Sequence, residues 1–241
     1  MRLWRQMGAA KAIMLRPISA SRARAFVRRV HYSGKVQPNS QLHLGVFHHG
    51  RLEGALQFGP SLDQRKASGL VAGTGWHEFI ELNRMAFSDT LPRNSESRAL
   101  GVAMRLLRKH APQVRWVLSY ADATQCGDGT IYRASGFVLT AIKNNNRLYR
   151  LPNGKIAHGI NMTATNLSRV VTESGWLSND TERTFTRRTG ATLLKGHQLR
   201  YIYFLDPSYR GRLTVPEIPF SEIAARGAGM YKGEKREYAV I

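Results

Sequence analysis

The chain has 241 residues, of which 42% are hydrophobic and 9% aromatic, so it can bury a substantial core. Its 36 Lys and Arg residues outnumber 16 Asp and Glu, and the formal net charge of +20 favours a polyanionic partner such as nucleic acid. No apolar run approaches the roughly 20 residues of a membrane span, and the first residues lack the apolar core of a secretory signal. The single cysteine, Cys126, excludes an internal disulfide and fits a reducing cytoplasm.

The N-terminal quarter is strongly basic, since the first 52 residues hold ten Lys and Arg residues and no acidic one. We predict an edge strand at 14–18 and a helix that runs from a cap at Ser19 or Ser21 to about His31. This helix carries four arginines that we expect to contact DNA phosphates: Arg22, Arg24, Arg28 and Arg29. A membrane-surface role is less well supported, because the helix offers few apolar side chains.

The middle of the chain alternates strands and helices. The predicted elements are a hairpin at 42–58, a loop at 60–75, a strand at 76–87, a helix at 95–110, a strand ending at Tyr120, a short helix carrying Tyr132, and strands at 137–142 and 147–151. Beyond about residue 159 the pattern changes, with a helix predicted at 167–176 and a strand at 197–205. We therefore predict a core at 1–160 and a basic extension at 161–241 that packs on it and helps to bind a polyanion.

Two motifs lie within this order of elements. Arg98-x-x-Gly101-x-Ala103 opens a helix, and Tyr132-x-x-x-Gly136-Phe137 follows a glycine-rich turn. Together they resemble the GNAT-type N-acyltransferase fold, an α+β (α/β) fold whose mixed, mostly antiparallel central sheet is flanked by helices. The resemblance implies that Ser97, Arg98, Gly101 and Ala103 hold the pyrophosphate of acyl-CoA and that Tyr132 acts as a general acid. The alternatives are an ordinary capped helix and a packing tyrosine, and the turn lacks the second glycine of the fuller family pattern.

Further segments sharpen the resemblance. They are His31-Tyr32-Ser33-Gly34, Glu81-Leu82-Asn83-Arg84, Asn94-Ser95-Glu96-Ser97, Tyr120-Ala121-Asp122 and Gly129-Thr130-Ile131-Tyr132. Over most of its length the chain resembles the Mom family of phage DNA-modification proteins. The resemblance implies conversion of adenine in phage DNA to N6-(carbamoylmethyl)adenine in the host bacterial cytoplasm, which shields the DNA from restriction.

The candidate catalytic residues lie where a predicted strand ends. The adenine N6 amine is a poor nucleophile because its lone pair is delocalised into the ring, so an enzyme must accept its proton and polarise the donor. Asp122, beside the hydroxyls of Ser119 and Tyr120, is the main candidate base; the alternative is that Asp122 caps the next turn. Glu81 is the second candidate, because the corresponding acyltransferase strand often carries a base.

His31 and Tyr32 are candidates for contact with an adenine extruded from double-stranded DNA, because enzymes that act on a base in a duplex take it out of the stack. The alternative is a structural role at the end of a helix. A metal site would need His43 or His48 together with His158 or Asp63, and the spacing does not support one. Cys126 lacks a paired base, so a catalytic thiol is not favoured.

The group donor and the reaction class each have alternatives. A carbamoylmethyl group on N6 is isomeric with a glycyl group, which makes glycyl-tRNA a chemically economical donor, and acyl-CoA is the family-level alternative. The protein would otherwise be an N-acetyltransferase acting on a protein or small amine, or a non-enzymatic basic DNA-binding protein, for which salt-sensitive binding without an altered nucleoside is expected. The sequence sets neither the target context nor the oligomeric state.

Overall fold

The computed structural model describes residues 10–124, 128–144, 148–154, 156–158, 177, 180–194, 196–228, 230–231 and 234–235. The helix predicted at 167–176 and the predictions for Cys126 lie outside these residues. The chain forms two compact units: the first comprises 1–121, 129–141 and 199–222, and the second comprises 122–128, 142–198 and 223–241. In the part of the chain described, no helix is long and apolar enough to cross a membrane.

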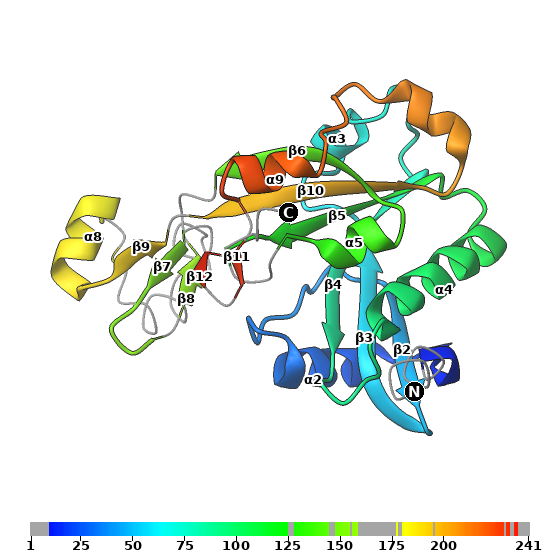
Figure 1. The fold of residues 1–241 in the computed structure, drawn as a ribbon, viewed down its shortest axis with the longest axis horizontal. Coiled ribbons are helices and arrows are strands. Elements are labelled where there is room, and N and C mark those ends of the chain that lie inside the picture. The colour runs from blue at the N-terminus through cyan, green and yellow to red at the C-terminus, as the bar shows by residue number, and fades with distance from the viewer. Residues whose placement is uncertain are drawn as a thin grey trace. The chain divides into compact units, whose positions relative to one another are not determined.

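A seven-stranded sheet with the order β1-β2-β3-β4-β5-β10-β6 forms the frame of the fold (Figure 1). Its strands are β1 Met14–Pro17, β2 Leu42–His48, β3 Arg51–Gly59, β4 Phe79–Phe87, β5 Trp116–Asp122, β6 Val138–Asn144 and β10 His197–Phe204. The first four strands pair antiparallel in sequence order, and β4 pairs parallel with β5. These findings confirm the expected α+β class with a mixed, mostly antiparallel central sheet.

The β4–β5 pair is shorter than the two strands that form it. Pairing runs from Phe79 with Trp116 to Leu82 with Ser119 and then ends, although β4 continues to Phe87 and β5 to Asp122. On the other side of β4, Gln57 pairs with Arg84 but Phe58 pairs with Leu82, so Asn83 is the extra residue of a β-bulge. The two strands therefore separate just after Leu82, beside a bulge that redirects the backbone.

Helices flank the sheet of the first unit (Figure 1): η1 Ala10–Ala12, α2 Ala20–Val30, α3 Gln64–Ser68, α4 Ser95–His110, α5 Thr130–Ala134 and η2 Pro207–Arg212. The Ser19 hydroxyl accepts from the Arg22 N–H, which confirms serine capping of α2. Buried Phe26 and Val27 of α2 pack with Ala55 of β3 and Ala86 of β4. The short helix α3 was not predicted; its Ala67 packs into a core cluster with Phe79 and Trp116, whose rings stack 4.5 Å apart.

The second unit contains a three-stranded sheet with the order β8-β7-β9 and the helix α8 Glu182–Thr189 (Figure 1). The strands of this unit are β7 Leu148–Arg150, β8 Ile156–His158, β9 Thr192–Leu194, β11 Met230–Tyr231 and β12 Glu234–Lys235, and its remaining helix is α9 Ser221–Ala225, which begins at the unit boundary. Phe185 of α8 is fully buried against Tyr149, Leu151 and Ala191. The unit therefore has a small core of its own.

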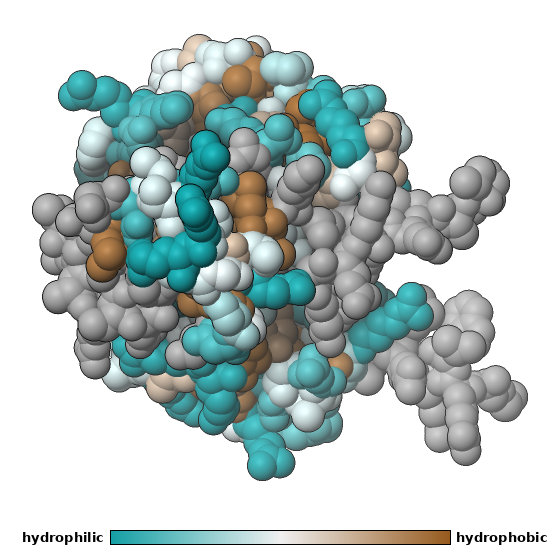
Figure 2. Space-filling view, turned by 90° about the vertical axis from the view of Figure 1, so that its left-hand side faces the viewer, coloured by the Kyte–Doolittle hydropathy of each residue, from teal (hydrophilic) through white to brown (hydrophobic). Residues whose placement is uncertain are grey.

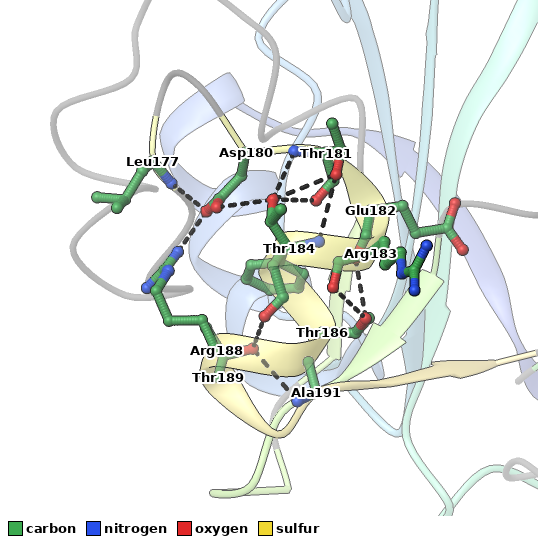
Figure 3. Close-up of polar contacts among 11 residues, drawn as sticks. Leu177, Asp180, Thr181, Glu182, Arg183, Thr184, Thr186, Arg188, Thr189 and Ala191 are labelled. Atoms are coloured by element: carbon green, nitrogen blue, oxygen red, sulfur yellow. Dashed lines mark hydrogen bonds and ion pairs between the residues drawn. The ribbon is translucent and has the colours of Figure 1, made fainter.

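Hydrogen bonds fix both ends of α8 (Figure 3). Thr181 and Thr184 form a reciprocal capping box at the start of the helix. The Asp180 carboxylate accepts from Leu177 N–H and from the Thr184 hydroxyl, and it forms an ion pair with Arg188. At the other end, the Thr189 hydroxyl donates to Phe185 carbonyl oxygen over 2.7 Å.

The sequence-based boundary near residue 160 does not coincide with the two units. The strand predicted at 197–205 forms as β10, but it lies inside the seven-stranded sheet between β5 and β6.

Figure 2 shows that hydrophilic residues predominate on the face turned to the viewer, with hydrophobic residues in smaller areas between them.

Candidate functional site

Glu81 and Tyr120 lie where β4 and β5 separate. Burial raises the pKa of the Glu81 carboxyl, and hydrogen bonds with the Ser61 and Asn83 side chains offset part of this effect. Burial also raises the pKa of the Tyr120 phenol, and the nearby Glu81 charge raises it further. A carboxyl whose pKa lies above its ordinary value is suited to act as a base close to neutral pH.

Arg200 of β10 opposes the negative charge at this place. Its positive charge lowers the pKa of Tyr120, whereas burial lowers the pKa of Arg200 itself. The guanidinium is held on β6, because Nε donates to the Thr140 hydroxyl over 2.9 Å and Nη2 to the Thr140 carbonyl oxygen over 3.0 Å. The site thus contains a half-buried carboxyl, a phenol and a fixed cation.

Ser119 and Tyr132 form a buried hydroxyl pair. The Ser119 hydroxyl lies 3.0 Å from the Tyr132 hydroxyl and 3.3 Å from the Leu82 carbonyl oxygen. The Tyr132 ring stacks on Tyr201 at 4.9 Å and meets the edge of Phe137 at 5.3 Å. The packing role and the functional role of Tyr132 are therefore compatible. The rings fix the side chain, and its hydroxyl contacts Ser119, the last residue of β5 that pairs with β4.

Gly129 allows this packing. It has a φ of +71°, and a Cβ atom at this position would lie 2.5 Å from the Tyr201 hydroxyl oxygen. Only glycine fits both the left-handed backbone and the close approach of the ring. The glycine-rich turn that precedes the Tyr132 helix is thus needed to seat the tyrosine pair.

Asp122 ends β5 and belongs to the second unit. Its Oδ1 accepts from the Thr124 N–H over 2.9 Å, which is the turn-capping arrangement that the sequence offered as the alternative. This contact does not test the catalytic hypothesis for Asp122, which stays a prediction.

The start of α4 carries the residues proposed for donor binding. Asn94 adopts a left-handed conformation, with φ of 69°, and makes no side-chain cap. An asparagine at this position lets the turn form without a second glycine, because asparagine tolerates the left-handed conformation. Ser95 Oγ and Arg98 Nε are buried and have no hydrogen-bond partner among the described residues.

These unpartnered donors fit a phosphate group. The N–H groups of a first helical turn lack intrahelical acceptors, so a helix start can bind an anion. Ser97 lies in this turn, and its carbonyl oxygen accepts at 3.5 Å from the hydroxyl of Ser135, the residue that follows α5. Gly101 and Ala103 lie further inside α4, where their N–H groups belong to the helix ladder.

His31 and Tyr32 follow α2, with ring centroids 4.2 Å apart and the Tyr32 side chain 51% exposed. Burial, assisted by the charge of Arg84, lowers the pKa of His31 to about 4. His31 Nδ1 accepts from the Ser33 N–H over 3.2 Å, so the neutral ring carries its proton on Nε2. Arg84 also lowers the pKa of Glu81, which connects the His31–Tyr32 pair electrostatically with the Glu81 carboxyl.

Comparison with known proteins identifies the family. The model of the Mom protein family matches residues 12–222. The chain belongs to the Mom protein family. It is 37% identical over 205 residues to the methylcarbamoylase mom of Escherichia phage Mu, covering 85% of this chain and 80% of that protein.

Two solved acetyltransferase structures are similar to this member of the Mom family. Arabidopsis thaliana NAA60, in complex with a bisubstrate analogue, is 14% identical and has a TM-score of 0.47, covering 80% of this chain and 97% of that chain. A putative GNAT-family acetyltransferase from Desulfovibrio desulfuricans is 12% identical with a TM-score of 0.42, covering 80% of this chain and 99% of that chain.

The first unit brings together several residues predicted from the sequence, namely Glu81, Ser119, Tyr120 and Tyr132. Sequence reasoning missed the contributions of Arg200 and Ser61, because both come from segments whose position depends on long-range packing. Arg84 lies in the segment Glu81-Leu82-Asn83-Arg84, which the sequence analysis noted, but its charge was not assigned a role there.

The described residues contain no group of three or more His, Cys, Asp or Glu side chains that could hold a metal ion. His43, one of the residues considered for such a site, lies on β2 with Nδ1 3.1 Å from Gln57 Nε2. Its imidazole is thus engaged in a buried contact with the neighbouring strand β3.

The four arginines of α2 differ in their contacts. Arg22 lies over the Phe47 ring and Arg29 over the Phe26 ring, each at 5.3 Å, and Arg24 donates to the Pro38 carbonyl oxygen.

Exchange of Arg22 and Arg28 for Gln should weaken DNA binding for all sequences. It should also lower the slope of log affinity against log salt concentration by roughly 2, about one unit per phosphate contact. An unchanged slope would move the DNA surface to the later arginines: Arg183, Arg187, Arg188, Arg210 and Arg212.

The depressed pKa of His31 predicts a pH dependence of stability. Below pH 6.5 the unfolded chain gains a proton on His31, whereas the folded chain gains it only near pH 4. The free energy of unfolding should therefore fall as the pH is lowered through this window. Denaturant melts of His31→Gln should lack this part of the fall, and His110→Gln, at an exposed histidine of α4, should retain it.

Proposed function

We propose that the protein is a transferase that converts adenine in DNA to N6-(carbamoylmethyl)adenine in the host bacterial cytoplasm and so protects phage DNA from restriction. The observation that carries the proposal is the half-buried Glu81 carboxyl, with its raised pKa, beside Tyr120 at the separation of β4 and β5. Membership of the Mom family and the basic composition support DNA as the substrate. The adenine is taken from the duplex and presented to this carboxyl.

Each residue has a defined part in the transfer step. Glu81 accepts the proton from N6 as N6 bonds to the acyl carbon of the donor. Arg200 stabilises negative charge beside Tyr120, and Tyr132, positioned by Ser119, gives a proton to the leaving oxygen or sulfur. The bond from the acyl carbon to this leaving atom breaks, so the products are an N6-acylated adenine and a protonated leaving group.

A glycyl group on N6 then rearranges without loss of atoms. Its free amine bonds to C6, and the bond from C6 to the original nitrogen breaks. That nitrogen becomes the terminal carboxamide, which yields the carbamoylmethyl product. Glycyl-tRNA and acyl-CoA both present phosphates, so Ser95, Ser97 and Arg98 at the start of α4 can hold either donor.

Mass spectrometry of nucleosides tests the proposal. DNA from bacteria that express the protein should contain a deoxyadenosine heavier by one carbamoylmethyl group, and DNA from cells with the empty vector should not. Growth on glycine labelled at both carbons should give this nucleoside two labels more than the unmodified deoxyadenosine from the same cells if glycyl-tRNA is the donor. An unmodified DNA pool together with an acetylated protein or amine would support the N-acetyltransferase alternative. Salt-sensitive DNA binding without a modified nucleoside would support the accessory DNA-binding protein.

Asp122, the main candidate base in the sequence analysis, stays a prediction beside Glu81. We expect Asp122→Asn to reduce the modified nucleoside below about a tenth of the wild-type amount, because it removes a carboxylate. The asparagine Oδ1 can still accept from Thr124 N–H, so the turn should persist and a thermal melt should change little. Activity above that level would limit Asp122 to its capping contact.

A further inference from the structure

The two most exposed large hydrophobic side chains of the described residues lie on one loop. Leu62 is 76% exposed and Trp76 is 62% exposed, and both belong to the segment between β3 and β4, which we call the 60–78 loop. A single exposed leucine is common on protein surfaces. Leu62 differs from such residues because its loop is fixed in place and lies next to the candidate site.

The 60–78 loop is fixed at several points. The Asn39 side chain donates to the Pro60 carbonyl oxygen over 2.7 Å. The Gln64 side chain accepts from Ser61 N–H and donates to the Trp76 carbonyl oxygen, each over 3.0 Å, and so connects the two arms of the loop. Near the second arm, Trp116 Nε1 donates to the Thr74 hydroxyl over 3.1 Å. The exposed side chains are therefore presented by an ordered loop.

The same loop contacts the candidate site. The Ser61 side chain is hydrogen-bonded to Glu81, and the charge of Asp63 contributes to the raised pKa of Tyr120. Leu62 stands between these two residues. An apolar side chain that is largely exposed to water thus lies one residue from a contact with the proposed catalytic carboxyl.

Two cations lie three and four residues after Leu62, beyond the exposed Asp63. Arg65 and Lys66 of α3 are exposed, and within the described residues neither forms a salt bridge. An apolar tip followed by free cations suits a nucleic acid duplex, because the tip can enter the base stack while the cations contact the flanking phosphates.

We propose that Leu62 enters the DNA duplex and occupies the space that the adenine leaves when it is extruded toward Glu81. The inference rests on the proposed function. Extrusion leaves a gap in the base stack, and an apolar side chain placed in it stabilises the opened duplex by replacing part of the lost stacking contacts. The rigid attachment of the 60–78 loop keeps Leu62 and the Glu81 carboxyl at a constant spacing, so filling of the gap and presentation of the base occur together.

The fluorescence of 2-aminopurine measures extrusion without any donor. Duplexes are made around an adenine that the wild-type protein modifies in cells, with 2-aminopurine in its place. Wild-type protein should raise the fluorescence, and Leu62→Ala should lose most of this rise and lower cellular modification at least about ten-fold. Leu62→Met, which keeps an apolar side chain of similar size, should retain both signals. Met14→Ala serves as the control, because Met14 is an exposed hydrophobic residue on the edge strand β1.

A duplex in which the 2-aminopurine is opposite an abasic site distinguishes extrusion from binding. Less stacking and no pairing must be lost there, so Leu62→Ala should approach the wild-type fluorescence. A wild-type level of extrusion and modification by Leu62→Ala in the fully paired duplex would overturn the inference and leave the proposed function standing. Equal loss by Leu62→Ala in both duplexes would also overturn it. If wild-type protein produced no modified adenine, the proposed function itself would fail.

Discussion

Replacement of Glu81 with Gln is expected to lower the amount of modified adenine at least about 100-fold, because general-base catalysis typically contributes 10²–10⁴-fold. Glutamine keeps the size of the side chain and can still bond to Ser61 and Asn83, the partners of Glu81. The substitution removes only the ability to accept the N6 proton. The measurement is the fraction of modified deoxyadenosine in DNA from cells that express each variant at equal soluble levels.

Two pH profiles provide an independent check of the Glu81 carboxyl. Because burial raises its pKa, wild-type activity should fall as the pH is lowered through a value above that of an ordinary glutamate. Stability should respond in the opposite sense. The folded chain holds this proton to a higher pH than the unfolded chain, so this contribution to stability falls as the pH rises through the window. Glu81→Gln should therefore gain stability relative to wild type above the window and none below it.

Glu78→Gln is the matched control. Glu78 lies three residues earlier, and its carboxylate accepts from Gly75 N–H over 2.7 Å, a contact that lowers its pKa. The same change at this position should leave modification within about two-fold of wild type. Equal losses in the two variants would show that Glu81→Gln acts through the local structure of β4.

Elements governed by local rules were predicted from the sequence. The serine cap and apolar spacing of α2, the β2–β3 hairpin and the amphipathic α4 each depend on residues within a few turns of one another. The helix α3 was missed because its five residues have a glycine-rich context. Packing of Ala67 against Phe79 and Trp116, which come from distant strands, supplies its stability.

Long-range pairing limited the prediction of the site. The strand at 197–205 was predicted, but its insertion between β5 and β6 depends on pairing with residues more than 50 positions away. This insertion places Arg200 beside Tyr120, so the cation of the site could not be assigned from the sequence. The environment of Glu81 likewise depends on Ser61, which the 60–78 loop brings back to β4.

Exchange of Tyr132 for Phe should lower modification by about 100-fold or more, while the protein remains folded. The ring that stacks on Tyr201 and meets Phe137 is preserved, and the hydroxyl that contacts Ser119 is removed. Ser119 keeps the Leu82 carbonyl oxygen as an acceptor, so the buried Ser119 hydroxyl is not left without a partner. A thermal melt should therefore change far less than the amount of modified deoxyadenosine.

Tyr203→Phe separates a catalytic hydroxyl from a structural one. The Tyr203 hydroxyl accepts from Arg108 over 2.9 Å, so this variant also loses one tyrosine hydroxyl and one hydrogen bond. Its modification level should stay within about two-fold of wild type. If Tyr132→Phe retained activity to the same extent, the proton on the leaving group would have to come from another residue, and Tyr132 would serve only to pack α5 against β10 through Tyr201. A large loss of modification in Tyr132→Phe alone would assign the general acid to the Tyr132 hydroxyl, which contacts Ser119 where the pairing of β4 with β5 ends.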